Sequence, residues 1–219
     1  MPTEPCRRLA LSMRVVQTRE YVEARDCIAQ DWSRLLAAVL PEAAWLAMPN
    51  DPDRVVPLMK AWAIDGLILT GGNDIGEHAE KDASDRAMLD YALRRGLPVL
   101  GVCRGLQVMQ TSAGGALVPL SDRSHVAVEH EIECLPHSLL NPGGKPVRLS
   151  VNSFHGFVIA PGGLAPGLEP MARAADGSIE AARISGAQAV GVMWHPERAP
   201  VPGETDRRLI RTLFGWPNP

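Results

Sequence analysis

Short apolar runs, each bounded by glycine, proline or charge, alternate along this chain with segments of helical periodicity. The clearest runs are residues 65–70 (DGLILT), 97–102 (LPVLGV) and 189–193 (AVGVM). They are apolar at consecutive positions, as strands are when both faces of a sheet are covered. Strands of this kind that alternate with helices indicate an α/β fold with a mostly parallel central sheet.

The remaining segments fit the same arrangement. Further strands are predicted at residues 13–17 and 45–49, and helices at 21–40, 53–63, 83–95, 104–113 and 204–214. The second half differs, because residues 130–135, 147–150 and 178–183 have the pattern of antiparallel strands separated by Pro/Gly loops. We therefore expect a small antiparallel extension of the sheet. No repeat or linker interrupts the chain, so we expect one domain over residues 1–219.

One junction between strand and helix has the pattern of a nucleophile elbow. The run at 97–102 ends in GVCRG (101–105), and a helical segment begins at once. In this G-x-C-x-G setting a strained turn projects its central residue, here Cys103, outward. The adjoining helix N-terminus should lower the thiol pKa, and the N–H of Arg104 can point at a developing oxyanion. The alternative is a structural cysteine buried under a tight turn.

A glycine-rich turn, TGGND (70–74), follows the strand at 65–70. The loops at the carboxyl ends of parallel strands build the site in open α/β sheets. The N–H of Gly72 is therefore a candidate second donor to an oxyanion. The alternative is an ordinary turn that ends the strand.

His195 directly follows the strand at 189–193, and Glu197 lies two positions further on. Of the six histidines, this one alone directly follows a strong apolar strand, so it is the candidate base for a thiol nucleophile. Side chains two positions apart in an extended segment face the same side, so the carboxylate can orient the imidazole. The alternative is a surface turn.

Charge and cysteine content limit the classes of function. A net charge of −3, without a basic stripe, argues against nucleic-acid binding and is compatible with a small acidic or amide substrate. The cysteines match no CxxC metal or redox pattern, and we expect free thiols in a reducing cytoplasm. They are Cys6, Cys27, Cys103 and Cys134. No apolar run approaches the ~20 residues of a membrane span.

Taken together, several motifs resemble the class I glutamine amidotransferases, and within them the γ-glutamyl hydrolase-like branch that includes γ-glutamyl-γ-aminobutyrate hydrolase. The motifs are ILTGGNDI (68–75), PVLGVCRGLQVMQTSAGGAL (98–117), EHEIE (129–133), VNSFHG (151–156), DGSIEAAR (176–183) and AVGVMWHPER (189–198). The resemblance implies a flavodoxin-like three-layer α/β/α sandwich. It also implies hydrolysis of a γ-glutamyl amide through a glutamyl thioester, with no metal and no organic cofactor.

The resemblance also implies roles for individual residues. Cys103 matches the nucleophile, and His195 and Glu197 match its partners. Gly72 and Arg104 match the backbone oxyanion donors. Gln107, one helical turn after the nucleophile, and the segment Asn152, Ser153, Phe154 and His155 match positions that bind the glutamyl substrate.

The leaving group is where the chain departs from the family pattern. Hydrolases of this branch often have N-S-x-H-H-Q, whereas this chain has NSFHGF (152–157), and Met193 stands where many relatives have Gln. The segments REYVEARD (19–26) and DW (31–32) resemble members encoded with bacterial surface-polysaccharide enzymes. One activity of such members converts γ-glutamyl-CDP-amidate to cytidine diphosphoramidate. Arg19 and Tyr21 are thus candidates to bind a polar or phosphorylated leaving group; a solvated helix start is the alternative.

Two other functions are compatible with the sequence. The chain could be the glutaminase subunit of an amidotransferase, in which case a partner synthase must receive the ammonia, because the sequence has no synthase domain. It could also be a non-catalytic sensor or binding protein that keeps an elbow cysteine. The pair of His195 and Glu197 argues against a sensor, which needs neither a base nor a group to orient it.

Overall fold

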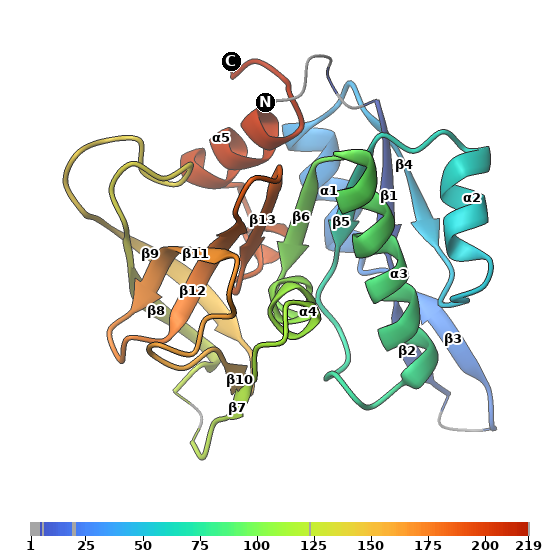
Figure 1. The fold of residues 1–219 in the computed structure, drawn as a ribbon, viewed down its shortest axis with the longest axis horizontal. Coiled ribbons are helices and arrows are strands. Elements are labelled where there is room, and N and C mark those ends of the chain that lie inside the picture. The colour runs from blue at the N-terminus through green and yellow to red at the C-terminus, as the bar shows by residue number, and fades with distance from the viewer. Residues whose placement is uncertain (1–4, 6, 19–20, 123, 219) are drawn as a thin grey trace.

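The computed structural model describes residues 5, 7–18, 21–122 and 124–218, and a nine-stranded mixed sheet forms its centre (Figure 1). In spatial order the strands are β4 (Ala44–Met48), β1 (Arg8–Ser12), β5 (Gly66–Leu69), β6 (Val99–Val102), β13 (Ala189–Val192), β12 (Ile179–Ile184), β11 (Leu168–Ala174), β8 (Val126–Cys134) and β9 (Val147–Phe154). Strands β4 to β13 pair in parallel. The pairs from β13 to β9 are antiparallel.

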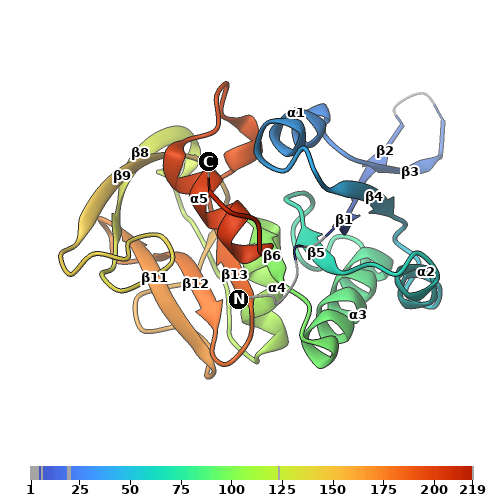
Figure 2. The same ribbon diagram turned by 90° about the horizontal axis from the view of Figure 1, so that it is seen from above.

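Helices cover both faces of the parallel half (Figure 2). One layer contains α1 (Gln30–Val39) and α5 (Glu204–Leu213), and the other contains α2 (Val55–Ala61), α3 (Ala79–Arg95) and α4 (Arg104–Ser112). Successive side chains of β1 point to opposite faces of the sheet. Leu9 and Leu11 pack with α1 and α5, while Ala10 packs with α2 and α3. Burial on both faces explains why these strands are apolar at consecutive positions.

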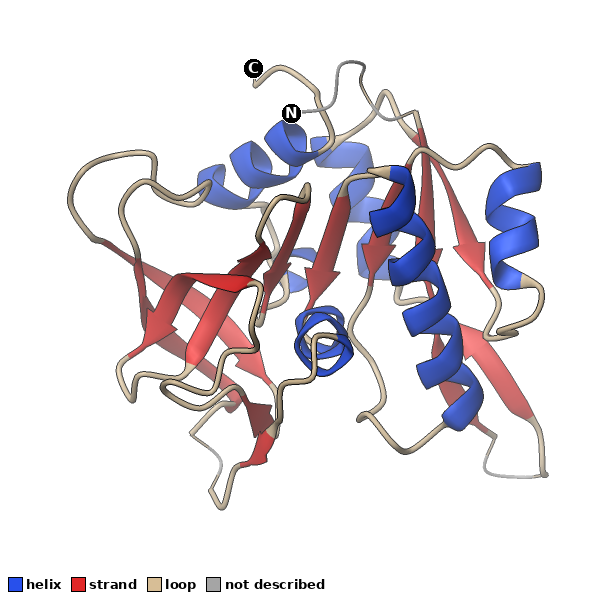
Figure 3. Ribbon diagram, in the orientation of Figure 1, coloured by secondary structure: helices blue, strands red, loops and turns tan. Residues whose placement is uncertain are grey.

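The predicted fold class is confirmed: the sheet is mostly parallel, is flanked by helices and continues into an antiparallel part (Figure 3). A strand does lie within the predicted range 13–17, but the prediction that it is the first strand of the central sheet is wrong. The core strand is β1, which is buried throughout Leu9–Ser12, whereas residues 14–17 form a separate, largely exposed strand, β2 (Arg14–Gln17). The apolar run Leu9–Leu11 is only three residues long, so the longer segment 13–17 gives the stronger strand pattern in the sequence.

The predicted start of the first helix is also wrong. Residues 24–27 form β3 (Ala24–Cys27), which pairs with β2 in a hairpin, and α1 begins only at Gln30. The helical spacing of apolar residues holds for Trp32 to Val39 but not for the charged segment before them. Strand β11 is absent from the predicted elements, because its sequence LEPMARA lacks clear alternation.

Parallel strands share one direction, so β1, β5, β6 and β13 bring their carboxyl ends to the same edge of the sheet. A short antiparallel pair, β7 (Val118–Pro119) with β10 (Phe157–Val158), and a 3₁₀ turn, η1 (Pro196–Arg198), complete the elements. None of the described helices combines the length and the apolar composition that crossing a bilayer requires.

Candidate active site

Cys103 occupies a strained turn between β6 and α4. Its φ of 51° and ψ of −100° are unusual for a residue with a side chain, and it is the N-cap of α4. The turn is tight: a Cβ on Gly105 would lie 2.3 Å from the carbonyl oxygen of Leu69, and one on Gly101 would lie 2.7 Å from the backbone of Gly105. Glycine is thus required on both sides of Cys103, as the elbow pattern predicts.

His195 and Glu197 form a buried pair just beyond β13. The imidazole Nδ1 lies 2.6 Å from Oε1 of Glu197, and the two residues are only 2% and 5% exposed. Because a carboxylate accepts, Nδ1 carries the proton, and Nε2 is left as the acceptor. Nε2 is buried and makes no hydrogen bond to any described residue. The predicted carboxylate–imidazole pair therefore exists, with its free nitrogen available for a proton.

The elbow and the imidazole lie at the ends of neighbouring strands. β6 and β13 pair in parallel with Val102 opposite Val192, and the N–H of Cys103 donates to the carbonyl of Val192 at 2.7 Å. The turn after β5 packs against the ring, since a Cβ on Gly71 would lie 2.6 Å from Cε1 of His195. The structure thus brings together at one edge the groups that the sequence placed 92 positions apart.

The expected lowering of the Cys103 pKa is wrong for the free protein. Burial, reinforced by the charge of Glu197, raises the pKa of Cys103 to about 12. The N–H of Arg104, at the start of α4, acts in the predicted direction and lowers the pKa, but it does not outweigh burial. At neutral pH the sulfur is therefore a protonated thiol, which needs a base to become a nucleophile.

One candidate oxyanion donor lies on the loop after β5, and the other lies at the start of α4. Gly72 follows β5, and a Cβ there would lie 2.9 Å from Cβ of Arg14, so β2 packs directly against this loop. The side chain of Asn73 forms two hydrogen bonds, of 2.8 and 3.0 Å, with the backbone of Val15. Arg104 supplies the other candidate N–H from the first residue of α4.

The side chain of Arg104 ties these two segments to α3 through a buried ionic network. Its guanidinium pairs with Asp82 at 2.5 Å and Asp85 at 3.0 Å, and it donates to the carbonyl of Asn73 at 2.8 Å. Lys81 pairs with Asp85 at 3.1 Å and donates to the carbonyl of Met13 at 2.7 Å. Burial lowers the pKa of Lys81, although Asp85 opposes that shift. The network therefore holds three segments in place relative to one another: the loop that contains Gly72 and Asn73, the turn at Cys103, and the start of β2.

Sequence reasoning missed this network, although a signal was present. Lys81 and Asp85 lie on the same face of α3 as Met88 and Ala92, at spacings of three and four residues. Charged residues on the apolar face of a helix are buried by the packing of that face and therefore need partners. The pattern would have indicated a buried ion pair, but not that Arg104 completes it.

The predicted glutamyl-binding segment lies beside His195, with differing roles for its members. Both polar atoms of the Asn152 side chain bond the backbone of His195, at 2.8 and 2.9 Å, so Asn152 holds the imidazole segment in place. Ser153 is fully buried and donates to the carbonyl of His125 at 2.7 Å. Phe154 is 40% exposed, and its ring lies 5.8 Å from that of His195. His155 points away into a separate buried cluster.

An open cavity of about 790 Å³ adjoins His195. Its lining includes Phe154 and Arg198, and the Arg198 guanidinium lies 4.2 Å from the centre of the Phe154 ring. Such a stacked cation and ring present a flat, positively charged surface. The same lining also contains Glu129, Glu204 and Asp206, so the stacked pair is the cationic part of a cavity of mixed charge next to the imidazole.

The other candidate residues make no described contact with His195 or Glu197. Gln107 is buried in α4, and its N–H donates to the carbonyl of Cys103. Tyr21 is exposed near the turn of the β2–β3 hairpin, where its hydroxyl accepts a hydrogen bond from Arg25 at 2.5 Å. Arg19 lies outside the described residues. Within the described part of the chain, Cys27, Cys103 and Cys134 are free thiols, as expected.

The family model named Peptidase C26 matches residues 10–197. A putative glutamine amidotransferase of Schizosaccharomyces pombe is 32% identical to this chain over 162 residues. The match covers 61% of this chain and 62% of the yeast protein, so over a third of the yeast protein has no counterpart in it. The gamma-glutamyl-CDP-amidate hydrolase of Campylobacter jejuni is 25% identical over 223 residues, covering 95% of this chain and 96% of the relative. A solved glutamine amidotransferase of Thermotoga maritima shares the fold, with a TM-score of 0.64 at 13% identity and coverage of 95% and 83% of the two chains.

The fold and the family match define the class. The chain belongs to the Peptidase C26 family, within the class I glutamine amidotransferase-like proteins. It is an enzyme, a cysteine-dependent hydrolase that acts on C–N bonds.

Proposed function

We propose that this enzyme hydrolyses a γ-glutamyl amide with Cys103 as nucleophile, His195 as base and acid, and Glu197 as the group that orients the imidazole. The observation that carries the proposal is the buried His195–Glu197 pair, whose free Nε2 lies at the sheet edge that also bears the strained Cys103. A nucleophile, a base and an orienting carboxylate are the three parts of a covalent hydrolase site.

The raised pKa of Cys103 defines the first step. A thiol with a pKa of about 12 attacks only as its proton leaves, so Nε2 of His195 takes that proton while the sulfur bonds to the γ-carbonyl carbon. Charge then develops on the carbonyl oxygen, where the N–H groups of Gly72 and Arg104 stabilise it. One such donor is worth ~10²–10³ in rate.

The intermediate collapses in two stages. His195 returns its proton to the departing nitrogen as the C–N bond breaks, which leaves a glutamyl thioester on Cys103. Water then attacks the thioester, gives its proton to His195 and releases glutamate, and the thiol regains a proton. Asn152 supports both stages by fixing the backbone of His195 through two hydrogen bonds.

For the leaving group we propose a nucleotide-linked amine, with γ-glutamyl-CDP-amidate as the first candidate. The full-length similarity to the Campylobacter jejuni hydrolase supports this, as does the stacked pair of Phe154 and Arg198 beside His195. A ring and a guanidinium suit a base and a phosphate respectively. The product would be cytidine diphosphoramidate, a precursor suited to surface-polysaccharide synthesis.

The test compares Cys103→Ala with Cys27→Ala, a free cysteine outside the proposed site, on a panel of γ-glutamylamines, glutamine and γ-glutamyl nucleotides. Release of glutamate should be lost in Cys103→Ala by a factor of at least ~10⁴ and unchanged in Cys27→Ala. Full activity of Cys103→Ala would reject the triad. Fast cleavage of simple γ-glutamylamines without cleavage of any nucleotide amide would reject the leaving group. Glutaminase activity that a separate synthase must switch on would instead identify an amidotransferase subunit.

A further inference from the structure

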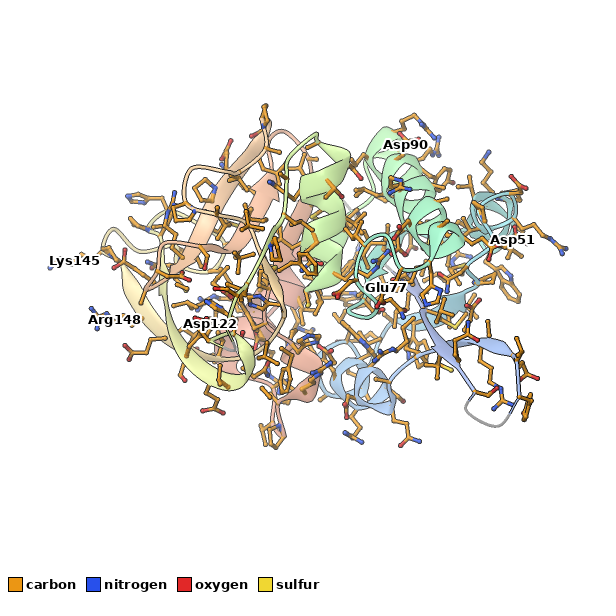
Figure 4. The ribbon with its side chains drawn as sticks, turned by 90° about the horizontal axis from the view of Figure 1, so that it is seen from below. Asp51, Glu77, Asp90, Asp122, Lys145 and Arg148 are labelled. Carbon is orange, nitrogen blue, oxygen red and sulfur yellow. The ribbon has the colours of Figure 1, made fainter. Side chains whose placement is uncertain are left out.

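A second cluster of titratable side chains lies outside the proposed triad, in the antiparallel half of the sheet. His125 precedes β8, His130 lies within β8, His155 follows β9, and Glu180 lies in β12. His125 and His155 are each 3% exposed, and Glu180 is fully buried. Charged side chains of the same strands otherwise face solvent, as Arg148 does in Figure 4.

Three imidazole nitrogens converge on the one carboxylate. Nδ1 of His125 and Nε2 of His155 each lie 3.5 Å from Oε1 of Glu180, and Nε2 of His130 lies 3.6 Å from Oε2. All five of these atoms are buried, and none makes a hydrogen bond within the described structure. Buried polar atoms without partners are costly, so their convergence from three separate segments, at β8, β9 and β12, requires an explanation.

The outer nitrogens of two rings show which atoms are available. Nδ1 of His155 lies 3.0 Å from the carbonyl of Phe157, and Nε2 of His125 lies 3.1 Å from the carboxylate of Asp176. Both partners are acceptors, so each neutral ring uses its single N–H there and turns a lone pair toward Glu180. In their neutral form these two rings therefore turn acceptors toward the carboxylate, and a cation placed among them would be bound by both rings and by Glu180.

The spacing suits a metal ion. The ligand atoms of His125, His155 and Glu180 all lie within 4.8 Å of one another. Ligands at ~2.0–2.1 Å around tetrahedral Zn²⁺ are about 3.4 Å apart, close to the 3.5 Å that separates each of these two ring nitrogens from Oε1 of Glu180. Metal-bound histidines also donate their other N–H to a carboxylate or a carbonyl, as these two rings do.

We propose that His125, His155 and Glu180 bind one divalent transition-metal ion, Zn²⁺ by the chemistry of the donor set, while His130 faces the second carboxylate oxygen of Glu180. This site is absent from the sequence-based expectations, which included no metal. It does not depend on the proposed triad, because it contains none of the three triad residues.

The position of the cluster gives the ion a structural task. The carbonyl of His125 accepts from the N–H of His155 at 3.0 Å and from Ser153 at 2.7 Å, next to Phe154 in the predicted glutamyl-binding segment. The carbonyl of Glu180 accepts from the N–H of Met193 at 2.7 Å, two residues before His195. An ion that joins β8, β9 and β12 would therefore stiffen the strand that carries the segment, β9, and the strand that pairs with β13, after which His195 follows.

The experiment measures metal binding directly, in the Cys103→Ala background so that the elbow thiol cannot be the ligand. The full chain is stripped with a chelator and titrated with Zn²⁺ and, separately, with Co²⁺, whose visible absorption reports tetrahedral nitrogen and oxygen ligation. We expect one ion per chain. We also expect a melting temperature raised by roughly 5–10 °C at a metal concentration a hundredfold above Kd.

Three variants locate the site. Glu180→Gln and His155→Asn remove ligands and should weaken binding by at least tenfold. Asp176→Asn changes only the half-exposed partner of His125, so it should fold normally and still weaken binding by ~10–100-fold. The matched control is His137→Asn, an exposed histidine outside the cluster whose φ of 58° asparagine tolerates; its binding should be unchanged.

Two results would overturn the proposal. One is a stripped chain that binds no Zn²⁺ or Co²⁺ and melts at the same temperature with and without them, which would indicate protonated histidines around Glu180 instead. The other is one-to-one binding that Asp176→Asn and Glu180→Gln leave unchanged, which would place the ion elsewhere. If the two ligand variants fail to fold, Asp176→Asn and the parent chain still decide between these outcomes.

Discussion

The parallel and antiparallel halves of the sheet hold their reactive side chains in different places. In the parallel half, Cys103, His195 and the Gly72 loop all lie beyond the ends of strands. In the antiparallel half, His130 and Glu180 lie within strands and point into a buried cluster, which His125 and His155 join from the ends of β8 and β9. Helices cover both faces of the parallel strands, which favours apolar residues within them and leaves the strand ends for chemistry.

This difference predicts that substitutions at the parallel edge affect the chemical step, whereas those in the antiparallel half affect stability and substrate positioning. The largest effect should follow from His195→Asn. Asparagine cannot take the thiol proton, so kcat should fall by ~10⁴ while the fold persists. Steady-state release of glutamate measures this, with thermal melting as the check on folding. A fall of less than tenfold would mean that another base serves Cys103.

Asp85→Asn should have the next largest effect. It leaves Lys81 and Arg104 without their shared carboxylate in a buried network, which typically costs ~3–5 kcal/mol in unfolding free energy. The matched control on the same helix is Asp90→Asn, whose carboxylate pairs with Arg94 at the surface (Figure 4) and should change the unfolding free energy by less than about 0.5 kcal/mol. Denaturant unfolding measures both. Equal effects would show that the network does not stabilise the fold.

The pH dependence of Cys103 alkylation tests its raised pKa. With a pKa of about 12 the thiolate fraction rises tenfold for each pH unit between 7 and 10, so the rate should rise tenfold per unit without a plateau. Mass spectrometry of the Cys103 peptide after timed iodoacetamide treatment measures the rate, with the denatured chain as reference. A plateau below pH 8 would instead show a thiolate–imidazolium pair in the free enzyme.

The smallest effect is expected in the antiparallel half, for Ser153→Ala. The Ser153 hydroxyl donates a hydrogen bond to the carbonyl of His125 and does not face the cavity. Its loss should lower the unfolding free energy by about 1 kcal/mol and the melting temperature by about 2–4 °C. Because the segment is expected to bind substrate through its backbone, kcat/KM should stay within about threefold. A large loss of kcat/KM without loss of stability would make the hydroxyl a direct substrate contact.

The two halves also differ in how well the sequence predicts them. The strands at 66–69 and 99–102 and the helices after them have strong local patterns, and the candidate residues Cys103, His195 and Gly72 directly follow such strands. The β2–β3 hairpin and β11 have weak patterns, because tertiary pairing rather than local periodicity determines them. The histidine cluster cannot be recognised in the sequence for the same reason, since its members come from three segments that only the antiparallel pairing brings together.

The most direct test of the account is to identify the covalent intermediate. The enzyme is quenched with acid during turnover of its best γ-glutamyl substrate, digested and analysed by mass spectrometry. A glutamyl adduct is expected on the peptide that contains Cys103, and no adduct is expected in Cys103→Ala. Turnover with no adduct on Cys103, or with the adduct on Cys27 or Cys134, would contradict it.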